Sequence, residues 1–98
     1  MVKKVVWSID AKRQLRDAYH YIRKDSLQNA IKVRKDIVDI ARKLPQHPEK
    51  YNTDKYKYCN DNSYRAFEKH HYRISYRVLE TQIRILRVRH TSMEPSEY

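Results

Sequence analysis

Two stretches of the chain repeat apolar residues at the spacing of an α-helix. In the first, the apolar positions are Ala11, Leu15, Ala18, Tyr19 and Ile22. In the second, an equivalent stripe consists of Ala30, Val33, Ile37, Ile40 and Leu44. Ser8 and Ser26 are suited to cap the starts of these helices, whereas Asp25 and Pro45 mark their ends. The pattern predicts two amphipathic helices in a tight antiparallel hairpin.

A period of two replaces the helical spacing in the second half of the chain. Residues 72–78 carry apolar and aromatic side chains on one face, and Arg73, Ser75 and Arg77 on the other. Further strands are predicted over residues 3–7, 64–67 and 83–89, with a turn over 79–82. In the last strand Ile83 and Ile85 are out of phase with Val88. This break indicates a β-bulge or burial of opposite faces along the strand.

The order of elements is β-α-α-β-β-β, which places the chain in the α+β class. An N-terminal strand and an antiparallel helix hairpin are expected to pack on a small, mainly antiparallel sheet. The 98 residues suffice for one core and contain no repeat, so residues 1–98 are predicted to form a single domain. Residues 45–63 lack periodicity and are expected to form a long loop, either without regular structure or with one short irregular strand.

Composition narrows the range of functions. The 22 Lys and Arg residues exceed the 12 Asp and Glu residues, and the formal charge of +10 favours a polyanion or an acidic protein as partner. The sequence has no glycine, which excludes Gly-rich phosphate loops and nucleotide cofactors. We expect no cofactor and no metal, because the single cysteine and the histidines match no zinc-site spacing.

The same features predict the compartment. One cysteine, Cys59, excludes an internal disulfide and fits a reducing environment. The first residues form no apolar signal segment, and no stretch is suited to span a membrane. A cytoplasmic protein without a membrane partner is therefore expected.

The strongest candidate for chemistry is a cluster of cations in the predicted sheet. It comprises Arg65, Lys69, Arg73, Arg77, Arg84, Arg87 and Arg89, with tyrosines between them. Such a surface pairs guanidinium groups with phosphates and stacks bases on aromatic rings. The alternative is a polar face that keeps one side of an antiparallel sheet in water.

Three weaker candidates accompany this cluster. His90 follows the last strand and is suited to proton transfer near neutrality, although its spacing alone favours an ordinary surface histidine. Lys55 and Lys57 alternate with tyrosines and form either a strand-like basic edge beside a phosphate backbone or a solubilising edge. Tyr98 is either a frayed residue or one that docks on a substrate.

Taken in order, the short motifs of the chain resemble a known family. They are Trp7-Ser8 with Ala11 and Leu15, Tyr21-Ile22, Leu44-Pro45 with Pro48, Tyr64-Arg65-Ala66-Phe67, Tyr72 to Val78, and Ile83 to His90. Over residues 3–90 this order resembles the RelE/ParE superfamily of bacterial type II toxin-antitoxin toxins. The resemblance implies a toxin that a cognate antitoxin neutralises, with a toxin-antitoxin hetero-oligomer as the possible assembly.

Two activities occur in that superfamily. RelE-like members cut mRNA on the ribosome, and ParE-like members poison DNA gyrase. For the RelE-like activity the resemblance implies that Arg73 holds the scissile phosphate and that His90, or more loosely Tyr98, is the general acid. Arg65 stands near one lysine of RelE, whereas the position of a second lysine is occupied by Ala66 or Phe67, and Glu49 is a weak match for an acidic base.

These observations leave three hypotheses. The first is a metal-independent mRNA endonuclease that acts on the ribosome, with Arg65, Arg73, His90 and Tyr98 as catalytic residues. Its RNA-binding residues would be Lys55, Lys57, Lys69, Arg77, Arg87 and Arg89. The second is a gyrase-poisoning toxin without nuclease activity, and the third is a non-catalytic nucleic-acid-binding domain.

Overall fold

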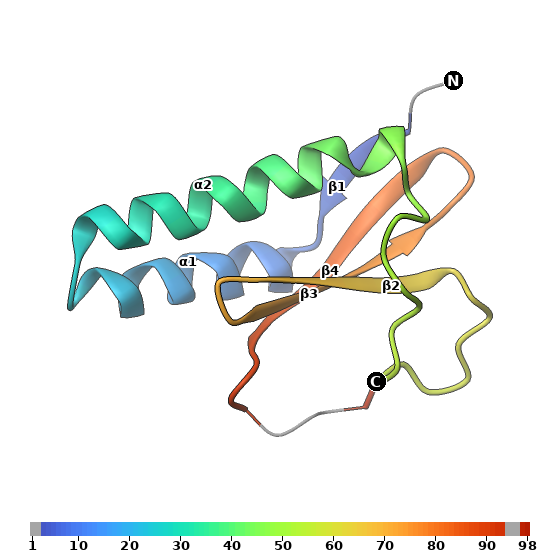
Figure 1. The fold of residues 1–98 in the computed structure, drawn as a ribbon. Helices are drawn as coiled ribbons and strands as arrows, with labels where there is room; N and C mark the ends of the chain where they lie inside the picture. The colour runs from blue at the N-terminus through green and yellow to red at the C-terminus, as the bar shows by residue number, and fades with distance from the viewer. Residues whose placement is uncertain (1–2, 94–96) are drawn as a thin grey trace.

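The computed structural model describes residues 3–93 and 97–98, and it has the predicted order of elements (Figure 1). The helices are α1 (Ile9–Arg23) and α2 (Leu27–Lys43), followed by a 3₁₀ turn at Leu44–Gln46. The strands are β1 (Lys4–Trp7), β2 (Tyr64–Lys69), β3 (Tyr72–Val78) and β4 (Gln82–His90). The fold is therefore of the α+β class, as predicted.

The predicted helix caps are confirmed. Oγ of Ser8 accepts a hydrogen bond from the backbone N–H of Ala11 at 3.0 Å, and Oγ of Ser26 accepts one from Asn29 at 3.0 Å. Each bond satisfies one of the amide groups that a helix start leaves without a partner. The hairpin between the helices is tight, since only residues 24–26 separate them.

The four strands form one sheet in the order β1-β4-β3-β2. β2, β3 and β4 pair antiparallel, whereas β1 pairs parallel with β4. Both helices cover the same side of the sheet, as Figure 1 shows. Side chains from α1, α2 and this side of the strands form the core, in which Ile37, Ile74 and Tyr76 are fully buried. We call this side of the sheet the helix face and the opposite side the loop face.

The predicted β-bulge is confirmed. β3 and β4 pair Ser75 with Arg87 and Tyr76 with Ile85, so that Leu86 is the extra residue. Because the extra residue reverses the alternation, Ile83, Ile85 and Val88 all reach the core despite their spacing. Among the described residues, no helix is long and apolar enough to cross a membrane.

The long loop packs around the β2 edge of the sheet. On the helix face, the Tyr76 hydroxyl donates to the carbonyl of Pro48 at 2.9 Å. At the edge, the N–H of Asp54 donates to the carbonyl of Tyr64 at 2.8 Å, and Thr53 forms an isolated bridge with Arg65. The next residues then lie against the loop face, where the candidate site is found.

Candidate functional site

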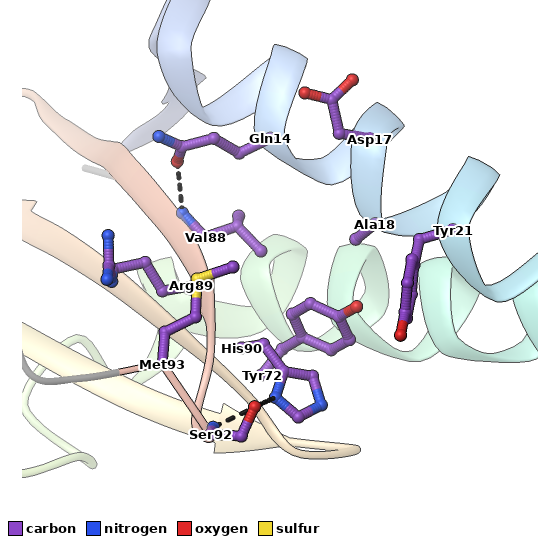
Figure 2. A pocket seen from close by; sticks show the side chains of 10 residues that line it. All are labelled: Gln14, Asp17, Ala18, Tyr21, Tyr72, Val88, Arg89, His90, Ser92 and Met93. Carbon is purple, nitrogen blue, oxygen red and sulfur yellow. Dashed lines mark hydrogen bonds between the residues drawn. The ribbon is translucent and has the colours of Figure 1, made fainter.

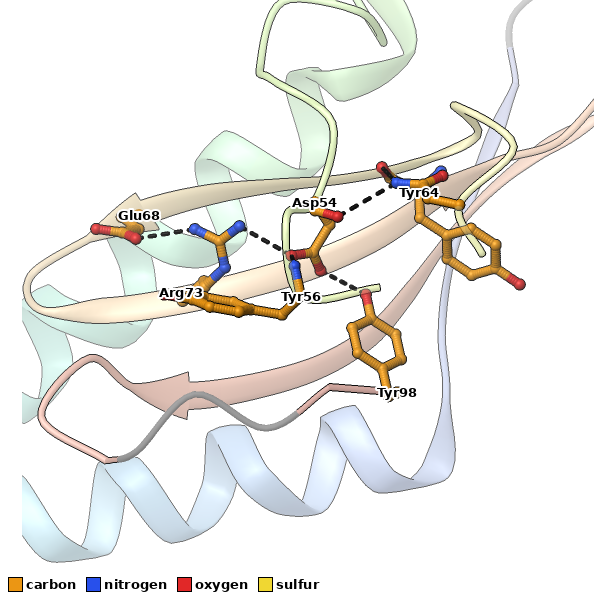
Figure 3. Close-up of polar contacts among 7 residues, drawn as sticks. Asp54, Tyr56, Tyr64, Glu68, Arg73 and Tyr98 are labelled. Carbon is orange, nitrogen blue, oxygen red and sulfur yellow. Dashed lines mark hydrogen bonds and ion pairs between the residues drawn. The ribbon is translucent and has the colours of Figure 1, made fainter. Parts of the chain in front are cut away.

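Arg73 is held between two carboxylates on the loop face (Figure 3). Its Nη2 donates to Oδ1 of Asp54 at 2.9 Å, and its Nη1 donates to Oε2 of Glu68 at 2.9 Å. The guanidinium also lies 4.9 Å from the centre of the Tyr56 ring. Only 15% of the Arg73 side chain is exposed. Burial alone would lower the pKa of Arg73, but the two carboxylates raise it above its ordinary value.

Asp54 is the buried centre of this cluster. Its side chain is 0% exposed, and it accepts hydrogen bonds from Arg73, from the Tyr98 hydroxyl at 2.5 Å and from the Tyr56 N–H at 3.1 Å. Burial by itself would raise the pKa of the Asp54 carboxyl, but the hydrogen bonds outweigh it, so the pKa is below its ordinary value. Asp54 is therefore ionised near neutral pH and paired with Arg73.

Tyr98 covers the cluster from the solvent side. Burial and the hydrogen bond to Asp54 raise the pKa of its phenol, which therefore stays protonated and acts as a donor. The guanidinium of Arg87 lies 4.0 Å from the centre of its ring, and Nζ of Lys57 donates to its carbonyl oxygen at 2.9 Å. The chain at residue 98 is thus fixed on the loop face rather than frayed.

This geometry limits what the cluster does chemically. The Arg73 donors that would hold a scissile phosphate are directed at Asp54 and Glu68. The cluster is suited to hold the loop and residue 98 on the sheet.

His90 lies on the helix face, opposite Arg73. It pairs across the strands with the core residue Tyr72, whose ring it meets edge-on at 5.0 Å. His90 lines a pocket of about 590 Å³ between α1 and the end of β4, together with Gln14, Asp17, Tyr21 and Met93 (Figure 2). Its Nδ1 accepts the backbone N–H of Ser92 at 3.0 Å, which places the proton of the neutral ring on Nε2.

Arg65 does not lie beside Arg73, which corrects the arrangement expected from the sequence. Its cross-strand partner is Tyr76, so its side chain belongs to the helix face. There Nη1 donates to the carbonyl of Tyr51 at 2.7 Å and to that of Glu49 at 3.5 Å. Of the four predicted catalytic residues, the structure brings together Arg73 and Tyr98, whereas Arg65 and His90 lie on the other face.

The sequence itself carried a signal for this separation. Arg65 stands two positions before Phe67, and His90 stands two positions after Val88. Residues two apart in a strand share a face. Because Phe67 and Val88 are core residues, the period of two directs Arg65 and His90 to the helix face as well.

Comparison with known proteins identifies the family. Residues 5–95 match the family model described as the ParE toxin of the type II toxin-antitoxin system parDE. The chain belongs to this family. It is therefore a toxin of a type II toxin-antitoxin system, as the resemblance implied. A search of curated protein sequences gave no significant match.

Solved structures share the toxin's fold. The chromosomal ParDE system from P. aeruginosa is 22% identical, with a TM-score of 0.72 over 93% of this chain and 98% of that one. The RelBE2 toxin-antitoxin complex from Mycobacterium tuberculosis is 20% identical, with a TM-score of 0.62 over 92% of each chain. The YoeB dimer from Staphylococcus aureus is 18% identical, with a TM-score of 0.56 over 89% of this chain and 94% of that one.

The predicted nucleic-acid contacts of the toxin fall on different surfaces. Lys55 and Lys57 do not form the expected strand-like edge, because residues 55–59 fold into turns. Instead, Nζ of Lys57 lies 4.6 Å from the Tyr64 ring centre and 5.3 Å from that of Tyr98. Lys69 pairs with Tyr72 and so belongs to the helix face. Arg77, Arg87 and Arg89 are on the loop face with Arg73.

Sequence reasoning missed Asp54. It named Glu49 as the acidic residue before the sheet, whereas Asp54 is the carboxylate that meets Arg73. An isolated acid among Lys55, Lys57 and the neighbouring tyrosines was the available signal, but nothing in the local pattern shows that it is buried. Among the residues that the structure describes, no group of three or more His, Cys, Asp or Glu side chains is arranged to hold a metal ion.

Proposed function

We propose that this toxin acts as a ParE-type inhibitor of DNA gyrase, in the cytoplasm, without cutting RNA. The observation that carries the proposal is the separation of Arg73 from His90 by the sheet. Cleavage of RNA at a 2′-hydroxyl needs a base, a cation for the phosphorane and an acid for the leaving oxygen, all within reach of one phosphate. Side chains on opposite faces of a sheet do not meet at one phosphate.

The electrostatics of the loop face support the same proposal. Arg73, the residue expected to hold the scissile phosphate, already binds Asp54 and Glu68. To engage a phosphate it would have to leave the buried Asp54 without its cation, which is costly. Inhibition by binding to a protein target requires no such rearrangement.

The mRNA endonuclease is the second candidate, because one observation favours it. Arg73, Arg87 and Tyr98 converge around Asp54 on the loop face. Such a group would offer cations and a phenol to a substrate if residue 98 moved away. The carboxylate of Asp54 would then be the general base in place of Glu49.

The partner of the toxin is a cognate antitoxin. The solved ParDE and RelBE2 structures are toxin-antitoxin systems, which supports the same kind of assembly for this chain. The formal charge of +10 favours an antitoxin segment that is acidic or amphipathic.

Two parallel assays with purified toxin test the proposed function. We expect the toxin to inhibit ATP-dependent supercoiling of relaxed plasmid by gyrase, and to leave both mRNA length and protein yield unchanged in a purified translation extract. His90→Gln should inhibit gyrase as strongly as the wild type, because His90 has no catalytic role in this account. Ribosome-dependent cuts in the mRNA that disappear in Arg73→Lys would establish the second candidate instead.

A further inference from the structure

The bulge at Leu86 places three arginines of β4 on one face of the sheet. Arg84 pairs with Arg77, Arg87 with Ser75, and Arg89 with Arg73. All of these partners have side chains on the loop face. Without the extra residue, Arg84 would face away from Arg87 and Arg89. We call Arg84, Arg87 and Arg89 the arginine row.

Two of these pairings oppose like charges. Arg77 faces Arg84, and Arg73 faces Arg89, in directly paired positions of an antiparallel ladder. Such opposition is destabilising unless anions neutralise it. The carboxylates near these arginines therefore decide how much of their positive charge is left uncompensated.

Three described carboxylates of the loop face lie at its β2 side. Asp54 and Glu68 are both bound to Arg73, and Asp61 lies 3.8 Å from Arg77. Arg84 is exposed, and within residues 3–93 and 97–98 its side chain forms no hydrogen bond or salt bridge. Positive charge is thus least compensated at Arg84 and at Lys4, which is exposed and shares its face through the pairing of β1 with β4.

The surroundings of the tyrosines on this face indicate whether it is suited to single-stranded or to duplex nucleic acid. Single strands are bound by stacking their bases on open aromatic rings. Here cations lie over the rings: Lys57 and Arg77 over Tyr64, and Lys57 and Arg87 over Tyr98. The surface therefore presents guanidinium and ammonium groups rather than open rings, which suits a phosphate backbone whose bases stay stacked.

We propose that the arginine row binds the phosphate backbone of duplex DNA, independently of base sequence, with Arg84 as the principal contact. Its guanidinium is exposed and suited to bidentate phosphate contacts. Binding of duplex DNA goes beyond inhibition of gyrase, because the toxin itself then contacts the DNA. It stands on the geometry of β4 and does not require the proposed function.

The test is a fluorescence anisotropy titration of the purified toxin with a labelled 20-base-pair duplex at several salt concentrations. We expect affinity to fall steeply with salt, as phosphate contacts release counterions. Arg84→Ala should weaken binding about tenfold and reduce the slope of log affinity against log salt by about 1. Arg84→Lys should restore part of the affinity, because it restores the charge without the bidentate geometry.

Arg34→Ala is the matched control. Arg34 is an exposed arginine of α2, on the helical layer, so its removal changes the net charge equally. Equal losses in Arg34→Ala and Arg84→Ala would overturn the proposal, because binding would then follow net charge alone. Tighter binding of a single-stranded RNA of the same length would also overturn it. Gyrase inhibition is measured separately, so a toxin that inhibits gyrase but does not bind the duplex refutes this inference alone.

Discussion

Asp54 and Arg73 form the interaction on which the loop face depends. Asp54 is fully buried and accepts hydrogen bonds from Arg73 and from two further donors. Arg73 also binds the exposed carboxylate of Glu68. The two carboxylates that bind Arg73 therefore share a partner but differ in solvent exposure. This difference makes them a matched pair for mutation.

Asp54→Asn should lower the free energy of unfolding by about 3 kcal/mol, because it removes the buried counter-charge of Arg73 and leaves only the exposed carboxylate of Glu68. Glu68→Gln should cost only a small fraction of that, since water screens an exposed ion pair. Urea unfolding of both variants measures the difference. Equal losses in the two variants would show that the burial of Asp54 has no special role.

Acid unfolding gives a second readout of Asp54. Because its pKa is lower in the folded state, its contribution to stability is present above pH about 4, the unfolded-state pKa of Asp. That contribution is lost as the pH falls through the lower, folded-state pKa. The melting temperature of the wild type should therefore fall more steeply below pH about 4 than that of Asp54→Asn. Parallel curves for the two proteins would contradict this assignment.

At the residue scale, the sequence predicted Arg73 but not the buried carboxylate at the centre of its cluster. Arg73 was predicted because the period of two in residues 72–78 fixes its face. Asp54 was missed because its burial depends on contacts distant in sequence, with Arg73 and Tyr98. A loop without periodicity offers no pattern from which such contacts can be inferred.

At the element scale, the helix starts and the bulge both followed from local pattern. Ser8 and Ser26 each precede an apolar helical stripe, and the phase change in residues 83–89 marks the extra residue at Leu86. The loop before β2 was less predictable, since alternation of Lys55 and Lys57 with tyrosines imitates a strand but turns form there instead. The side chain of Asn60 holds the two ends of this turn region together, because it donates to the carbonyls of Asp54 and Tyr64.

The two cap residues provide a prediction at this scale. The Ser8 hydroxyl caps α1 and also donates to the carbonyl of Leu86 at 3.0 Å, whereas the Ser26 hydroxyl only caps α2. Ser26→Ala should cost about 1 kcal/mol, and Ser8→Ala about 2 kcal/mol, because it also removes the link to the bulge. Thermal unfolding of the two variants compares them, and a larger loss for Ser26→Ala would contradict the role given to Ser8.

At the scale of the whole molecule, the sheet separates two surfaces of the toxin. The helix face and its pocket hold His90, and the loop face holds Arg73, Tyr98 and the arginine row. Family and fold were predictable from the order of motifs. The separation of His90 from Arg73 by the sheet was harder to predict, because it depends on the register of three strands. The period of two within each strand indicates only which of its own residues share a face.

Trapping of gyrase on DNA tests the central claim most directly. Supercoiled plasmid is incubated with gyrase and the purified toxin, then treated with detergent and protease, and the yield of linear DNA reports covalent gyrase-DNA complexes. The account predicts that linear DNA rises with toxin concentration, equally for the wild type and for His90→Gln. Linear DNA that stays at background, at toxin concentrations that arrest translation in an extract and fragment its mRNA, would contradict it.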